Sequence, residues 1–402
     1  MRELLGVEEY LDELLVLVRP DERSEVLPLA AAFGRVLAAD VAAAASVPAF
    51  DNSAMDGYAV RFAEVAGAPA VLRVVGDVPA GSADDPDAGP GECVRIMTGA
   101  PLPAFADTVV PVEDTRVEDD EVSVLAPPAR RGAHVRRAGE DVDAGDLVAP
   151  AGAALTPGVV GAVAAAGVRT VAVRPRPVVA VCATGDELVT DGSALRRGQV
   201  HESNALALAA ALTRDGAEVV AAAPVGDRPA ALAARLDGLA ASGCALVVLT
   251  GGASVGAYDV VRDVLTGAGG TFRHVRVQPG KPQGWAWWRG VPVVSLPGNP
   301  LSASLSYELF VRPLVDRMLG RPGPGWLPAV AGAAWTSPQG RRQVVPVLLS
   351  GEDDGRLVAR PAHRRGSASH VVTSLAGADG IAVVAEDVTA VEPGDALQVR
   401  WL

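Results

Sequence analysis

The chain has 402 residues, of which 49% are hydrophobic and only 4% are aromatic, and its formal net charge at pH 7 is -13. At about 100–200 residues per domain, this length predicts two to four domains. The negative charge argues against a general nucleic-acid or anionic-membrane surface, although a local pocket can still be basic.

Three cysteines (Cys93, Cys182 and Cys244) lie far apart, without the spacing of a metal site, and we expect them to be buried thiols in a reducing compartment. The first 15 residues are acidic and amphipathic, unlike a signal peptide. No apolar run approaches the roughly 20 residues of a membrane span. We therefore expect a cytoplasmic protein.

The N-terminal half alternates between short helices and a β-rich region. Apolar spacing predicts a helix over 7–18 and a second short helix over 27–39. Residues 41–136 are β-like, with runs at Val71–Val75, Glu92–Met97 and Thr108–Val112. Residues 137–172 include a helix that starts at Thr156-Pro157. We expect 1–40 and 137–172 to form one discontinuous linker and dimerisation domain beside a β-rich domain over 41–136.

Residues 173–320 alternate strictly between strands and helices, which predicts a three-layer α/β domain around a parallel sheet. The expected strands are Val178–Ala183, Val219–Ala222, Ala245–Thr250, 271–277 and 292–296. The expected helices run from Ser203 to about Asp215, over 229–241, after Tyr258 and over 301–319. Residues 321–326 are rich in Pro and Gly and mark a boundary. The remainder, to residue 402, has only β-like runs, so we expect a C-terminal β barrel.

Rare residue types stand in motif-like loops. Lys281 is the only lysine among 35 lysine and arginine residues, and it lies in the stiff loop Gln278-Pro279-Gly280-Lys281-Pro282. The three asparagines, Asn52, Asn204 and Asn299, also lie beside Gly, Pro or Ser. An ammonium group is a compact point charge that a planar guanidinium does not copy. Because the chain otherwise uses arginine, we interpret Lys281 as a functional residue.

Three loops follow the ends of predicted parallel strands, where open α/β sheets bind ligands. Gly-rich backbone and hydroxyl groups in these loops suit an anion, although a tight turn is the alternative for each of them. The candidate anion-binding residues are Thr184, Gly251, Gly252, Ser254, Asn299 and Ser302. Glu187 and Asp259 at the same edge suit Mg²⁺, with helix capping as the alternative. The five histidines show no ligand or triad spacing.

Taken together, the chain resembles the MoeA-type molybdopterin molybdenumtransferases, which are related to the E domain of gephyrin. The resemblance covers essentially the whole chain and rests on an ordered set of motifs: DNSAMDGYAVR, IMTGAPLP, GED, TGDEL, SN, TGGASVGAYD, PGKP and SLPGNPLSA. It implies a multidomain α/β plus β protomer with a molybdopterin-binding α/β domain, a β-rich domain, a discontinuous linker domain and a C-terminal β barrel. It also implies a homodimer in which the DNSAMDGYA loop of one subunit serves the site of the other.

The resemblance implies an enzyme that inserts molybdenum from molybdate into adenylylated molybdopterin, with Mg²⁺ as cofactor and release of AMP. The adenylylating enzyme of the same pathway is an implied partner. By motif, the catalytic candidates are Asp56, Asp141, Asp259 and Lys281, and the metal candidates are Glu187, Asp227 and Asp259. By the same resemblance, Thr98, Pro297, Pro300, Arg341 and Ser367 join the substrate-binding candidates.

One departure from the family pattern is Gln278, where members often carry a lysine. It weakens any two-lysine clamp on molybdate, and we expect Gln278→Lys to be tolerated and to tighten molybdate binding. A second departure is a single acid, Asp227, in Gly-Asp-Arg-Pro, where a second acid is common. Two alternatives stay open: a non-catalytic scaffold of the gephyrin kind and the adenylyltransferase of the pathway. A scaffold of the gephyrin kind usually carries extra domains, and the adenylyltransferase needs neither the DNSAMDGYA motif nor the C-terminal barrel.

Overall fold

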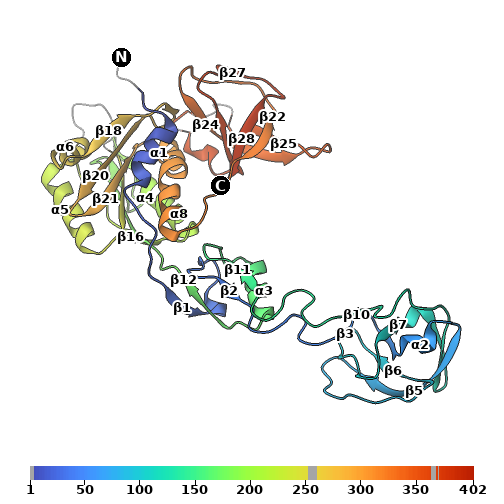
Figure 1. The fold of residues 1–402 in the computed structure, drawn as a ribbon. Helices are drawn as coiled ribbons and strands as arrows, with labels where there is room; N and C mark the ends of the chain where they lie inside the picture. Colours follow the sequence, from blue (N-terminus) through green and yellow to red (C-terminus); the bar gives the residue numbers. More distant parts are fainter. Residues whose placement is uncertain (1–3, 252–259, 364–367, 370) are drawn as a thin grey trace. The chain divides into compact units, whose positions relative to one another are not determined.

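The computed structural model describes residues 4–251, 260–363, 368–369 and 371–402, and the chain divides into two compact units (Figure 1). The large unit comprises residues 1–25, 34–38 and 174–402, and the small unit comprises residues 26–33 and 39–173. The candidate residues Gly252, Ser254, Asp259 and Ser367 lie outside the described residues. The four-domain division expected from the sequence stays a proposal.

The large unit contains a six-stranded sheet in the order β16 (Glu218–Ala221), β13 (Val178–Ala183), β17 (Leu246–Thr250), β21 (Val291–Leu296), β20 (Pro282–Trp288) and β18 (Thr271–His274). The first four strands are parallel, as predicted. Strand β20 was missed, and it pairs antiparallel with β21 and β18. It joins β21 through Arg289-Gly290, both with positive φ, and this two-residue hairpin forces the antiparallel direction.

Helices cover both faces of this sheet, so the predicted three layers are confirmed. One face carries α1 (Val7–Leu15), α4 (Asn204–Arg214), α7 (Pro300–Ser306) and α8 (Arg312–Leu319), and the other carries α5 (Pro229–Ala241) and α6 (Val260–Gly267). The helix predicted over 301–319 is interrupted, because Tyr307–Val311 form a π-helical segment. Two short strands, β14 (Leu188–Val189) and β15 (Val200–His201), pair beside the sheet.

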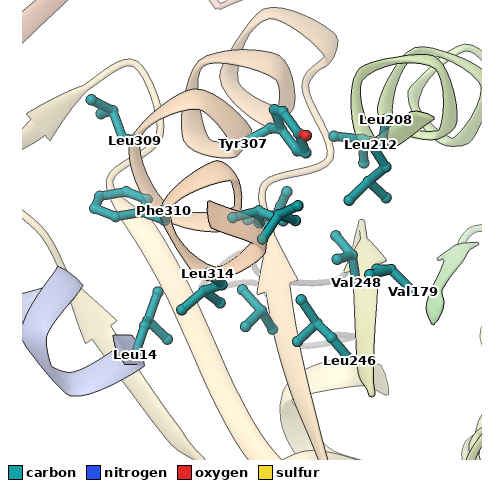
Figure 2. Packing of buried hydrophobic residues seen from close by; sticks show 14 of the residues in the cluster. Leu14, Val179, Leu208, Leu212, Leu246, Val248, Tyr307, Leu309, Phe310 and Leu314 are labelled. Carbon is teal, nitrogen blue, oxygen red and sulfur yellow. The ribbon is translucent and has the colours of Figure 1, made fainter. Parts of the chain in front are cut away.

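The first helix packs on the large unit and not with the linker segments with which the sequence analysis grouped it. Its buried Tyr10 meets Phe310 edge to face, with ring centroids 5.0 Å apart. Leu14 belongs to the same buried cluster as Phe310, Leu314 and Leu246 of β17, and it lies on the side of Phe310 and Leu314 (Figure 2). The apolar stripe of this helix is therefore used to cover the sheet.

The C-terminal region is a barrel closed by five strands: β22 (Leu327–Ala331), β24 (Arg342–Gly351), β25 (Leu357–Pro361), β26 (Gly380–Val384) and β28 (Ala396–Trp401). Strand β24 pairs with both β25 and β26, which closes the ring and confirms the expected barrel. Small additions are β23 (Trp335–Thr336), β27 (Ala390–Val391) and the 3₁₀ turn Val372–Ser374. Strand β19 (Val277–Gln278) pairs with β24, so the loop that carries Lys281 starts at the barrel.

The small unit is built around a six-stranded sheet in the order β7 (Thr108–Pro111), β4 (Gly57–Val60), β6 (Glu92–Ile96), β5 (Ala70–Val78), β9 (Glu121–Val124) and β8 (Thr115–Glu118). Its helical elements are α2 (Phe62–Val65), α3 (Pro157–Ala165) and the 3₁₀ turn Val112–Asp114. Three further pairs of strands are β1 with β12 (Glu25–Pro28 and Thr170–Val173), β2 with β11 (Val41–Ala42 and Leu147–Ala149) and β3 with β10 (Asn52–Ser53 and Val135–Arg136). Thr156 caps α3, as its sequence predicts.

The helix predicted over 27–39 is wrong. Residues 25–28 form β1, and a single 3₁₀ turn, Leu29–Ala31, follows. The amide of Leu29 donates to the carbonyl of Arg169, and Gly34 has a φ of +74°. Strand pairing and a left-handed glycine therefore override the local apolar periodicity.

A buried charge network joins the helices of the large unit to its barrel. Asp215 and Glu308 are 3% and 4% exposed, and Arg214 donates to both, at 2.9 and 2.7 Å. The Tyr307 hydroxyl donates to Asp215 at 2.7 Å. Arg400 of β28 donates to the Glu308 carbonyl at 2.6 Å. Because Glu308 and Arg400 are both buried, their pairing fixes the barrel against the helix.

Asp215→Asn should destabilise the large unit by about 2 kcal/mol at neutral pH, because it removes the buried charged acceptor of Arg214 and Tyr307, although Arg214 is 40% exposed and keeps Glu308 as a partner. Burial raises the pKa of Asp215, but hydrogen bonds from Arg214 and Tyr307 lower it by more, so the folded-state pKa lies below the ordinary 3.8. The stabilisation that ionised Asp215 gives to the fold is therefore complete above its ordinary pKa of 3.8. It is lost as pH falls through the lower pKa of the folded state.

Urea denaturation at neutral pH and at about pH 3 measures this effect, and the difference from wild type should shrink at the lower pH. The control is Glu218→Gln on the exposed edge of β16, with an expected change within about 0.5 kcal/mol. Equal midpoints for the two variants at neutral pH would show that the network does not stabilise the fold.

Candidate functional site

Three parallel strands of the large unit end at the same level of the sheet. Ala183 of β13 pairs with Thr250 of β17, and Thr250 pairs with Leu296 of β21. The loops that follow these residues therefore start side by side at the carboxyl edge. This is the edge where open α/β sheets bind ligands, and the arrangement brings the predicted Thr184, Gly251 and Pro297 together.

Asn204, the first residue of α4, joins two of these loops. Its side-chain nitrogen donates to the Thr250 hydroxyl at 2.8 Å and to the Gly298 carbonyl at 2.7 Å. The Thr250 hydroxyl in turn donates to the Pro297 carbonyl at 3.2 Å. The sequence analysis noted Asn204 for its rarity but gave it no site role. The structure shows that it holds the loops after β17 and β21 in place.

The glycines of these loops allow the backbones to approach closely. Gly251 has a φ of +98°, and a Cβ on it would lie 2.5 Å from the Thr184 carbonyl oxygen. A Cβ on Gly298 would lie 3.3 Å from the Gly251 Cα. Since a side chain fits poorly at either position, the two glycines are required by the packing of the loops.

The loops border a cavity of about 580 Å³, which we call the strand-end cavity. This volume lies within the range of about 300–1,000 Å³ that is usual for small-molecule sites. Of the predicted residues, its lining includes Thr184, Glu187, Asp227, Gly251, Asn299 and Pro300. Residues that the sequence analysis did not assign also line it, among them His201, Glu202 and Asn204.

Two predicted metal ligands, Glu187 and Asp227, line the strand-end cavity from different loops. The carboxylate of Asp227 accepts the Asp186 amide at 3.3 Å, and that of Asp186 accepts the Asp227 amide at 3.1 Å, which ties the two loops together. In the described part of the chain, no group of three or more His, Cys, Asp or Glu side chains is arranged to hold a metal ion.

Helix capping was the alternative for Glu187, but this residue directly precedes the strand β14 and not a helix, and a different acid caps α4. Glu202 accepts the amide of Ala205 at 2.7 Å, in the first turn of α4. Ser203, the predicted cap, forms no capping hydrogen bond with its side chain.

A second cavity, of about 290 Å³, contains Lys281, and we call it the lysine cavity. Its lining includes Gln278, Asn299, Ser302, Arg341 and Ser369. Two of its described lining residues are cationic and none is acidic, so it suits an anion. Gly298 and Asn299 line both this cavity and the strand-end cavity, so the two are neighbours.

The loop that carries Lys281 is held from beneath by Gln283, which is fully buried. Its side-chain nitrogen donates to the Gly280 carbonyl and to the Ser306 hydroxyl, both at 2.7 Å. Gly280 has a φ of +102°, and a Cβ on it would lie 2.8 Å from the same hydroxyl. The backbone on which Lys281 stands is thus fixed by buried hydrogen bonds.

In the small unit, three motifs that are distant in sequence meet. The Ser53 amide donates to the Ala100 carbonyl at 3.0 Å, and the Ala54 amide donates to the His134 carbonyl at 2.9 Å. Asp51 accepts the Ala138 amide at 2.8 Å. The loops around predicted Asp56, Thr98 and Asp141 are therefore connected to one another, with Asp141 exposed.

The carboxylate of Asp56 accepts both the amide and the hydroxyl of Thr98, at 2.7 and 2.8 Å. These two hydrogen bonds lower the pKa of Asp56. A general base works best with a pKa near the working pH, so a lowered pKa favours an ionised acceptor that holds a loop or ligand. A catalytic role for Asp56 remains a prediction.

Comparison with known proteins gives a consistent result along the chain. Residues 5–167 match the MoeA N-terminal region (domain I and II), residues 180–317 match a probable molybdopterin binding domain, and residues 328–402 match the MoeA C-terminal region (domain IV). Molybdopterin molybdenumtransferase 2 of Mycobacterium tuberculosis is 44% identical over 94% of this chain and 95% of its own length.

Two further relatives extend the comparison. The molybdopterin molybdenumtransferase of Bacillus subtilis is 32% identical over 91% of this chain and 86% of its own length. The crystal structure of the molybdopterin biosynthesis MoeA protein of Pyrococcus horikoshii OT3 matches with a TM-score of 0.84 at 26% identity, and it covers all of both chains.

Asn204→Ala should weaken the binding of an anion in the strand-end cavity by up to about thirtyfold, because it removes two hydrogen bonds of about 1 kcal/mol each that hold the loops in place. Calorimetric titration with inorganic pyrophosphate measures the effect. The matched control is Leu206→Ala on the same helix, a side chain that is 72% exposed. If the two variants bind pyrophosphate equally well, the loops do not depend on Asn204.

Proposed function

This chain belongs to the molybdopterin molybdenumtransferase family, and on that premise we propose that it transfers molybdenum from molybdate to adenylylated molybdopterin with release of AMP. The observation that carries the finer proposal is the pair of adjacent cavities with different charge. One is lined by glycine backbone, hydroxyl groups and the three carboxylates of Glu187, Glu202 and Asp227, and the other by Lys281 and Arg341.

The strand-end cavity suits the pyrophosphate-linked part of the substrate. Closely packed glycine loops expose amides, which bind phosphate oxygens. Thr184 and Asn204 add polar side chains at the same edge. The side chain of Asn204 fixes the loops before substrate arrives, so less ordering is required on binding.

The lysine cavity suits molybdate as a substrate, because molybdate is a tetrahedral oxyanion. Lys281 and Arg341 supply positive charge, and Ser302 and Ser369 supply hydroxyl groups. The cavity lies next to the strand-end cavity through Gly298 and Asn299. A pterin substrate in the first cavity would therefore have molybdate held beside it.

Glu187 and Asp227 fit a Mg²⁺ ion that is bound together with substrate phosphate. Mg²⁺ usually takes one or two carboxylates and completes its shell with waters and phosphate oxygens. When bound, the ion would neutralise charge that develops as the phosphoanhydride is cleaved. The residues themselves come from two loops that the paired amides of Asp186 and Asp227 hold together.

The remaining expectations are part of the same proposal. We propose a cytoplasmic homodimer whose substrate is supplied by the adenylylating enzyme of the pathway. All three cysteines are buried and unpaired, which agrees with a reducing compartment. In the described part of the chain, no helix is long and apolar enough to cross a membrane.

The direct test is to incubate the purified protein with adenylylated molybdopterin, Mg²⁺ and molybdate, and to measure AMP. Lys281→Arg should lower the rate by about 10²–10³-fold if the ammonium group stabilises the oxyanion. Arg276→Lys, at a position just outside the lysine cavity, controls for the general effect of exchanging arginine and lysine side chains. Activity of Lys281→Arg within a few-fold of wild type, at an unchanged melting temperature, would contradict this role.

Glu187→Gln and Asp227→Asn should each raise the half-saturating Mg²⁺ concentration for AMP release by about tenfold or more, since each removes one anionic ligand. Binding of the adenylylated pterin without metal should change less. A titration of Mg²⁺ at saturating pterin measures both effects. An unchanged half-saturating concentration in both variants would mean that these carboxylates are structural.

The resemblance further implies that Asp56 and Lys281 serve one reaction from different subunits. Inactive Asp56→Ala and Lys281→Ala chains, unfolded together and refolded as a mixture, should then regain roughly a quarter of wild-type activity by symmetry counting. Differently tagged chains confirm that mixed dimers form. Mixed dimers without activity would show that both residues serve the same subunit, or that Asp56 has no role in the reaction.

A further inference from the structure

Gln278 makes a specific contact in the lysine cavity. The Arg341 guanidinium donates through Nη1 to the side-chain oxygen of Gln278 at 2.8 Å, in partly buried surroundings. The two backbones are fixed beside each other, because β19 pairs with β24 and the Arg342 amide donates to the Arg276 carbonyl at 2.8 Å. This hydrogen bond therefore joins the loop of Lys281 to the loop that leads into the barrel.

The charge of Arg341 is not neutralised by this contact. Its neighbour Arg342 pairs with Glu8 and Glu386. Arg341, in contrast, takes part in no ion pair within the described residues, and its partner is a neutral amide. A primary amide can accept through its oxygen without adding negative charge. Gln278 thus orients the guanidinium and leaves its positive charge available in a cavity with no described acid.

We propose that Gln278 is a positioning residue for oxyanion binding, which holds Arg341 as the second cation beside Lys281. This inference rests on the proposed function, with molybdate as the anion. A guanidinium presents several N–H groups in a fixed plane, so one of them can bond Gln278 while others face an oxyanion. Without that hydrogen bond, the long side chain gains rotamer freedom and binds the anion less well.

The contact reverses the expectation that Gln278→Lys tightens molybdate binding. A lysine has no acceptor for Arg341 and brings a like charge beside it, so the guanidinium should move away. Gln278→Met removes only the hydrogen bond, at similar volume. Gln278→Glu keeps an acceptor but cancels one of the two positive charges. The three substitutions therefore separate orientation from charge.

The experiment measures the half-saturating molybdate concentration in AMP release, together with molybdate binding by equilibrium dialysis and elemental analysis. Gln278→Met and Gln278→Lys should each raise both values by about tenfold, as for a hydrogen bond to a charged group. Half-saturation by adenylylated pterin and the maximal rate should stay near wild type. Gln278→Glu should also weaken binding, and more so at low ionic strength, where charge is screened least.

A double-mutant cycle tests whether Gln278 acts through Arg341. Arg341→Met alone should weaken molybdate binding, and Gln278→Met added to it should cost nothing further. Gln278→Lys with Arg341→Met should bind better than Gln278→Lys alone, because the new lysine no longer faces a cation. Arg342→Met, whose side chain lies outside the cavity lining, is the matched control and should leave molybdate half-saturation unchanged.

Three results separate the possible failures. A wild-type protein that neither binds molybdate nor releases AMP overturns the proposed function and this inference with it. An active wild type with weakened Arg341→Met but unchanged Gln278→Met overturns the positioning role alone. Additive effects in the Gln278 and Arg341 cycle do the same, since they show that the two side chains act independently.

Discussion

The candidate site depends on the register of three parallel strands. Because Ala183, Thr250 and Leu296 are paired across β13, β17 and β21, the loops that follow them begin at one edge of the sheet. Register alone would leave glycine-rich loops free to move, since glycine provides no side-chain contacts. Asn204 supplies the missing restraint through its two hydrogen bonds. The shape of the strand-end cavity follows from both.

Charge is divided between the two cavities that this edge supports. The strand-end cavity has carboxylates on its lining, and the lysine cavity has cations and no described acid. A cation that bridges to phosphate fits the first, and an oxyanion fits the second. Gly298 and Asn299 line both cavities, which allows two ligands of different charge to lie close together. The Gln278–Arg341 pair preserves this division, because it orients a cation without neutralising it.

Much of the large unit was predictable from local patterns. Strand Val178–Ala183 and the helix at 229–241 have the bounds that the sequence predicts. The errors came from interactions that local patterns do not contain. Strand β20 was missed because its direction depends on a two-residue hairpin at Arg289-Gly290, and the helix over 27–39 was wrong because β1 pairs with the distant β12. Pairing between remote strands is decided by tertiary contacts.

The sequence by itself determined the candidate residues of the site: a single lysine in a stiff loop, glycines and hydroxyls after buried strands, and acids at the same edge. Only the tertiary structure decided their partners. It showed that Asn204 joins two loops, that Glu202 and not Ser203 caps α4, and that Gln278 accepts a hydrogen bond from Arg341. The physical reason is that a motif reflects the conformation of a short stretch of backbone. Hydrogen bonds between residues 63 or 94 positions apart, in contrast, form only once the sheet and barrel have folded.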